Sequence, residues 1–265
     1  MNVLTNMLYV ALVFYAMGTV VALATLLTTS KAAQRAALYL MIAGFAAHTI
    51  WIGSICAKTG HPPLTNLPEV TSFIAWSIFA AVLALYTRYR VYAASFFVYP
   101  LVLLLLTLTA IVHEKFEPLD PALRSNVFTA HLLLSTVGVA GLIIGLAFTF
   151  LAYMQDRSLK SKTRGRLWEM IPSLSVCRFV AYRSMAIGFI VYTLGLLSGV
   201  LWSYRTTAGL MEFRSKQVGA VVAWILFAVI LQSYISGSYR ARRVALLSAG
   251  AFIAIAIAIL GIQHG

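Results

Sequence analysis

Charged residues are scarce in this sequence, and acidic residues are the scarcest. Only 10% of the residues are charged, with 20 Lys and Arg against 7 Asp and Glu, and the formal net charge is +13. With 61% hydrophobic residues, the chain has too few charges to cover a soluble domain, so a polytopic membrane protein is predicted. The cations lie between apolar runs, which indicates contacts with anionic membrane lipid and argues against nucleic-acid binding.

Cysteine and the usual catalytic motifs are rare or missing. The two cysteines, Cys56 and Cys177, fit no CxxC pattern, so neither a disulfide nor a thiolate metal site is expected. No apolar run holds paired carboxylates, and there is no HExxH motif, no Walker glycine loop and no nucleophile with a base nearby. Pro100 is the only proline inside an apolar run, and no inverted repeat of the transporter type is evident. Hydrolases and ion-coupled transporters are therefore disfavoured.

Uniformly apolar runs of membrane-spanning length recur along the whole chain. They cover about 4–28, 36–57, 69–87, 92–112, 127–154, 180–203, 217–236 and 244–263. Because these runs do not alternate apolar and polar residues, they favour helices over a barrel. The sequence predicts an all-α integral membrane protein of about eight helices in one bundle, with residues 1–265 forming a single polytopic domain. The first run is too long for a signal peptide and is expected to be a span.

The links between the runs indicate an orientation. Most cations follow the first, third, fifth and seventh runs, and most acids lie in the other links. The positive-inside rule then places both termini outside the cytoplasm, and a bacterial inner membrane is the expected location.

A predicted helical hairpin runs from Ile171 to Phe227. Its first helix carries the small residues Gly188, Gly195, Ser198 and Gly199. Small residues let two helices approach closely in lipid, where no hydrophobic force drives association. Taken singly, these glycines indicate helix packing rather than a binding site.

Histidine is the most informative polar residue inside the runs. His48 lies near the middle of the second run, where an ionisable group normally faces a partner, a cavity or a ligand. His131 lies about one turn inside the outer end of the fifth run, and His264 follows the eighth run on the same predicted face. Two neutral imidazoles from different helices can bind a haem iron from both sides. A hydrogen-bonded packing role for His48, or a frayed end for His264, is the alternative reading, and His61 and His113 fall in outer links.

Several spaced motifs connect these observations. Those of the hairpin are Pro172-Ser173-Leu174, Tyr182-Arg183, Gly188-Phe189, Thr193-Leu194-Gly195, Gly199 and Trp202. An earlier motif, GHPPLTNLPEV, carries Gly60, Pro63, Asn66 and Glu69. Together with His48, His131 and His264, they resemble the cytochrome c assembly family that includes CcsA, ResC and HemX. The resemblance spans about residues 36–264.

The resemblance implies a function and a cofactor. Members of the CcsA type carry haem across the membrane and present it outside for thioether attachment to the CxxCH cysteines of apocytochrome c. His131 and His264 would then be axial ligands of the haem iron at the outer face. His48 would be half of an intramembrane haem site.

The chain departs from the family pattern in two places. Where members of the CcsA type carry a tryptophan-rich loop, this chain has Thr207, Met211, Phe213 and Arg214. The second intramembrane histidine is replaced by Gln232, whose amide oxygen is a poor iron ligand. The aromatic faces that would stack on a porphyrin are lost, although Arg205 and Arg214 offer cations for its propionates.

Three functional hypotheses follow. The leading one is a haem-binding membrane protein of cytochrome c biogenesis that handles or delivers haem at the outer face with a ResB-like membrane partner. On its own it would not be an enzyme, and at most it would form the haem-delivering part of a cytochrome c synthetase. The second is a HemX-like regulator that acts on glutamyl-tRNA reductase through the basic link from Arg157 to Arg166. The third is a structural membrane subunit without a cofactor.

Overall fold

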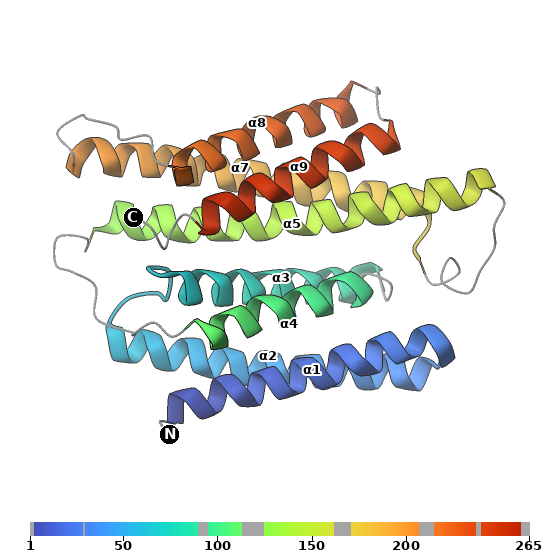
Figure 1. The fold of residues 1–265 in the computed structure, drawn as a ribbon, viewed down its shortest axis with the longest axis horizontal. Helices are drawn as coiled ribbons and strands as arrows, with labels where there is room; N and C mark the ends of the chain where they lie inside the picture. The colour runs from blue at the N-terminus through green and yellow to red at the C-terminus, as the bar shows by residue number, and fades with distance from the viewer. Residues whose placement is uncertain are drawn as a thin grey trace. The chain divides into compact units, whose positions relative to one another are not determined.

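A computed structural model describes residues 3–28, 30–89, 95–112, 125–161, 171–206, 215–236 and 240–260, and within these ranges all regular structure is helical. The helices are α1 (Val3–Thr28), α2 (Lys31–Thr59), α3 (Leu67–Tyr89), α4 (Ser95–Ile111), α5 (Asn126–Ser161), α7 (Leu174–Thr206), α8 (Ser215–Ile235) and α9 (Ala241–Leu260) (Figure 1). Each of the eight helices coincides with one of the predicted spans. The predicted all-α membrane fold is therefore confirmed.

The helices differ in how fully they span a bilayer. Seven of them are long and apolar enough to cross a membrane. The exception is α4, which has 17 residues in the structure and contains Pro100. At 1.5 Å per residue it is about 26 Å long, slightly less than the hydrocarbon core of about 30 Å.

The ends of α2 show why the helices extend beyond the apolar runs. The Ser30 side chain caps the first turn, accepting a hydrogen bond from the Ala33 N–H at 3.3 Å. At the other end, Gly60 adopts φ +76° and donates its N–H to the Cys56 carbonyl at 2.9 Å. A left-handed residue at this position ends a helix at little steric cost only when it is glycine.

The chain forms two compact units. The first contains α1, α2, α4 and the part of α3 from Pro68 onward, and the second contains α5, α7, α8 and α9. The prediction of a single domain stays a prediction.

In the first unit, glycines bring α1 and α2 together. A β-carbon built on Gly18 would lie 2.8 Å from Met41 Cγ, and one built on Gly44 would lie 2.7 Å from Tyr15 Cδ1. Both Met41 and Tyr15 have no exposed surface. The two glycines therefore make room for two large buried side chains.

In the second unit, α5 and α7 cross at backbone contact. A β-carbon on Gly138 would lie 2.6 Å from the Tyr192 nitrogen, and one on Gly188 would lie 2.7 Å from the Leu142 nitrogen. The predicted close approach through the small residues of α7 is thereby confirmed, with α5 as its partner. Such close approach is how helices associate in lipid.

Candidate functional site: the His131 seat on α7

His131 lies near the start of α5, and its ring faces α7. Its Nδ1 is 2.8 Å from the carbonyl oxygen of Gly195. A carbonyl can only accept, so Nδ1 carries the proton and donates this hydrogen bond. The lone pair of the neutral ring is therefore on Nε2, which has no hydrogen-bond partner among the described residues.

Hydroxyl groups surround the same contact. Ser198 donates its Oγ–H to the Gly195 carbonyl at 2.8 Å, and the Ser135 hydroxyl lies 3.4 Å from His131 Nδ1. The Gly195 oxygen thus accepts from both the imidazole and a serine of its own helix. These contacts fix the tautomer and the orientation of the ring.

Two glycines of α7 make room for this contact, Gly199 for the imidazole and Gly195 for Ser135, and we call them the seat. A β-carbon built on Gly199 would lie 2.6 Å from Cε1 and 2.7 Å from Nδ1 of His131. A β-carbon on Gly195 would lie 2.6 Å from the Ser135 hydroxyl oxygen. Real β-carbons essentially never come so close to other atoms, so only glycine at 199 leaves the ring where it is.

An aromatic pair lies one helical turn from the seat. The rings of Phe128 on α5 and Trp202 on α7 have centroids 4.7 Å apart. Phe128 precedes His131 by three residues, so the two lie on one face of α5. Trp202 follows Gly199 by three residues, so these two lie on one face of α7. The aromatic pair therefore lies towards the end where α5 begins and α7 finishes.

His48 has a different environment in the first unit. Its Nε2 lies 2.7 Å from the Ser72 hydroxyl, its Nδ1 lies 3.4 Å from the Tyr15 hydroxyl, and the residue has no exposed surface. Both ring nitrogens are therefore occupied by hydroxyl groups. An iron at His48 would have to displace one of these contacts, and its haem role stays a prediction.

The remaining predicted site residues, apart from Gln232, lie outside the part of the chain that the structure describes. His264 lies outside the described residues, as do Thr207, Met211, Phe213 and Arg214 of the degenerate loop. Gln232, which replaces the second intramembrane histidine, is exposed on α8.

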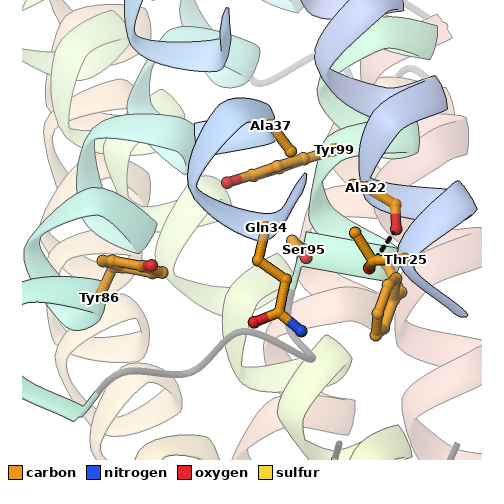
Figure 2. A pocket seen from close by; sticks show the side chains of 8 residues that line it. Ala22, Thr25, Gln34, Ala37, Tyr86, Ser95 and Tyr99 are labelled. Carbon is orange, nitrogen blue, oxygen red and sulfur yellow. Dashed lines mark hydrogen bonds between the residues drawn. The ribbon is translucent and has the colours of Figure 1, made fainter. Parts of the chain in front are cut away.

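A small cavity is found in the first unit, lined by the end of α1, the start of α2, Tyr86 of α3 and the start of α4. Figure 2 shows Gln34, Thr25, Ser95 and Tyr99 around it, with Thr25 donating a 2.6 Å hydrogen bond to the Ala22 carbonyl. The volume of the cavity that the centre of a water molecule can occupy is about 10 Å³. This is close to the smallest volume that holds one buried water. The cavity is far too small for a porphyrin.

Comparison with known proteins decides the family. The profile described as "Cytochrome C assembly protein" matches residues 64–264, more than half of the chain. The chain belongs to the cytochrome c assembly protein family. The match covers both the seat on α7 and His131.

Curated relatives agree with this assignment. The chain is 27% identical over 234 residues to "Cytochrome c biogenesis protein CcsA" of Guillardia theta, covering 81% of this chain and 78% of the relative. It is 26% identical over 228 residues to the protein of the same name from Prochlorococcus marinus (strain MIT 9301), covering 77% and 74%. A third, from Mesostigma viride, is 24% identical over 227 residues, with the same coverage.

Sequence reasoning missed the supporting residues of the site. The pattern marked Gly195 and Gly199 as packing positions but did not connect them to His131, which lies 64 residues before Gly195. Nothing in the sequence singled out Ser135 or Phe128 as part of a site. Their only sequence clue is the spacing of three or four residues from His131, which puts them on its helix face.

Proposed function

We propose that this protein acts in cytochrome c biogenesis as a haem-binding membrane protein, with His131 as an iron ligand. The observation that carries the proposal is the hydrogen bond from His131 Nδ1 to the Gly195 carbonyl. Metal-binding histidines commonly donate their second ring nitrogen in this way, which directs the other lone pair to the metal. The ring is neutral and oriented, so the residues fit an axial ligand.

The second ligand of the proposed site is His264, from the end of the chain. The names of the relatives support the role, because each is described as a cytochrome c biogenesis protein. When bound, haem would supply the porphyrin that becomes attached to an apocytochrome c. This chain would hold and orient it at the outer face of a bacterial inner membrane, with both termini outside, together with a ResB-like partner.

The absorption spectrum of the protein purified from membranes tests this proposal. We expect a low-spin haem spectrum that is lost in His131→Ala and in His264→Ala. His61→Ala is the matched control, because His61 is a histidine of a predicted outer link whose Nδ1 contacts the Pro62 carbonyl at 2.8 Å. A colourless wild-type protein, or an unchanged spectrum in His131→Ala, would overturn the proposal.

A second candidate function is regulation of a soluble haem-synthesis enzyme, as in the HemX branch. The observation that favours it is an excess of cations at one end of the second unit. Arg157 and Lys160 are exposed at the end of α5, and Arg240, Arg242 and Arg243 are exposed at the start of α9. Asp156 is the only acid among the described residues of these stretches, and it pairs with Lys160 at 2.7 Å. Deletion of the gene for this protein would support this candidate if it altered the abundance of glutamyl-tRNA reductase while cytochromes c matured normally.

A further inference from the structure

The two units contain the same aromatic brace. In the first, the Trp76 Nε1–H donates to Thr49 Oγ1 at 2.9 Å, and the Trp76 ring stacks on Phe45 at 5.4 Å with an angle of 23°. Thr49 in turn donates to the carbonyl of Phe45 at 2.7 Å. The three residues tie α3 to α2.

In the second unit, Trp224, Thr193 and Phe189 repeat this arrangement. The Trp224 Nε1–H donates to Thr193 Oγ1 at 2.9 Å, and its ring stacks on Phe189 at 5.5 Å and 23°. Thr193 donates to the Phe189 carbonyl at 2.7 Å. The donors, acceptors, spacing and angles all agree with those of the first brace.

A glycine cradle is also repeated. A β-carbon on Gly18 would meet the Met41 side chain and lie 3.3 Å from the Ala37 carbonyl oxygen. A β-carbon on Gly145 would meet the Met185 side chain and lie 3.3 Å from the Ala181 carbonyl oxygen. The α1–α2 contact of the first unit is therefore reproduced by α5 and α7.

Constant offsets relate the equivalent positions. From α2 to α7 the numbers rise by 144, as from Met41 to Met185 or Thr49 to Thr193, and from α3 to α8 by 148, as from Trp76 to Trp224. The helix pairs share further identities at these offsets: Ala37 with Ala181, Gly44 with Gly188, Ser54 with Ser198, Val70 with Val218, Ala75 with Ala223, Phe79 with Phe227 and Tyr86 with Tyr234.

The polar residue before the brace threonine also has an equivalent contact. His48 reaches Ser72 on the next helix at 2.7 Å, and Tyr192 donates to the Ala220 carbonyl at 3.2 Å. Position 192 is 48 plus 144, and position 220 is 72 plus 148. The equivalent positions thus contact each other in both units, through the Ser72 side chain in the first and the Ala220 main chain in the second.

We infer that the chain contains two copies of one helical unit, with α1, α2 and α3 of the first equivalent to α5, α7 and α8 of the second. In the second copy Gly195 and Gly199 stand where the first has Trp51 and Ile55, and they are the positioning residues of His131: Gly199 makes room for the ring, and Gly195 makes room for Ser135 and accepts from the ring. In the first copy Trp51 is 1% exposed and Ile55 is fully buried, so two large side chains fill the space beside this part of α2. In the second copy Gly199 leaves space that the imidazole occupies, and Gly195 leaves space for Ser135. The equivalent of His131 in the first copy, 127 positions earlier as Gly18 is to Gly145, is Leu4.

This inference rests on the proposed function only for its haem readout, so the first experiment needs no haem. Gly199→Ala should lower the Tm of the purified protein by several degrees, because its β-carbon would collide with the His131 ring. In a His131→Ala background the same substitution should lower the Tm by less than half as much, because the ring is gone. Such a double-mutant cycle measures the coupling of the two positions. Equal losses in both backgrounds would overturn the role of Gly199 as a positioning residue of His131.

The second experiment reads the haem. Gly199→Ile introduces the residue type that the first copy has at the equivalent position, Ile55. It should reduce the amount of haem per protein at least tenfold, while the protein remains monodisperse in detergent. Gly250→Ala in α9 is the matched control and should retain wild-type haem, because its β-carbon would make only an ordinary 3.7 Å contact with Leu226. Wild-type haem content in Gly199→Ile would overturn the role of the seat. A wild-type protein without haem would overturn the proposed function instead, and the Tm cycle would still decide whether Gly199 positions His131.

Discussion

The two four-helix units share a brace and a glycine cradle but treat histidine in opposite ways. In the first unit both nitrogens of His48 contact hydroxyl groups, and the residue has no exposed surface. In the second unit His131 donates one nitrogen to the Gly195 carbonyl and keeps a lone pair on the other. The two histidines therefore differ in the groups that face the ring: hydroxyl groups contact both nitrogens of His48, whereas one nitrogen of His131 has no partner among the described residues.

The largest expected effect separates the two histidines by their chemistry. We expect His131→Ala to abolish the low-spin haem signal and His48→Ala to leave the signal per folded protein within about twofold of wild type. The reason is that, of these two histidines, His131 is the one with an acceptor nitrogen that has no partner among the described residues. Reduced-minus-oxidised spectra of both variants make the measurement. A signal lost in both would show an iron at His48 as well and would break the comparison.

Next in size is the response of the two helix crossings to an added methyl group. Gly188→Ala would place a β-carbon 2.7 Å from the Leu142 nitrogen, and Gly44→Ala would place one 2.7 Å from the Tyr15 ring. A backbone cannot move aside as a side chain can. We therefore expect a loss of about 1–3 kcal/mol for Gly188→Ala and a smaller loss for Gly44→Ala. Thermal unfolding of both variants in the same detergent tests the order, and the reverse order would contradict it.

A loss of similar or smaller size is expected when the hydrogen bonds of His48 are removed. His48→Phe keeps an aromatic ring but leaves the Ser72 hydroxyl without its 2.7 Å partner. An unsatisfied buried hydroxyl destabilises a protein by about 1–3 kcal/mol. Adding Ser72→Ala should recover part of the lost Tm, because the orphaned hydroxyl is then gone. No recovery in the double variant would show that the ring shape, rather than the hydrogen bond, carries the effect.

The smallest effect tests the equivalence of the two braces. Thr49→Val and Thr193→Val each remove the acceptor of a 2.9 Å tryptophan hydrogen bond while nearly preserving side-chain volume. Each should lower the free energy of unfolding by about 0.5–1.5 kcal/mol. The two shifts in Tm should agree closely, since the contacts are the same. A large difference between them would indicate that the braces contribute differently despite their matching geometry.

The sequence predicted the helices well and their ends less well. The predicted span 36–57 became Lys31–Thr59, because Ser30 and Gly60 cap the helix outside its apolar part. Likewise, α5 continues past residue 154 to Ser161, and the Lys160 and Asp156 side chains pair one turn apart near its end. Hydropathy marks the part of a helix that fits the lipid, whereas capping and side-chain pairs decide where the hydrogen-bonded helix stops.

The candidate site was only half predictable. His131 was identified because an ionisable side chain inside an apolar run is costly and usually has a function. This can be recognised from the run of residues around His131 alone. Its contact with Gly195 depends on the rotation of α5 against α7, which a sequence of nearly continuous apolar residues does not specify. The repeat could have been found from the shared spacing of Ala, Met, Gly, Phe and Thr in α2 and α7, but most neighbouring positions differ between the copies.

The partner of the His131 ring is a main-chain oxygen, and this has an evolutionary consequence. A carbonyl group is present whatever amino acid position 195 encodes, so no single codon change can delete the acceptor. Drift along α7 can therefore replace most neighbouring side chains and leave the imidazole anchored, provided that nothing bulky arises at the two glycines. Selection would then act on the smallness of these positions rather than on any polar group, and such a signal is easily mistaken for ordinary helix packing.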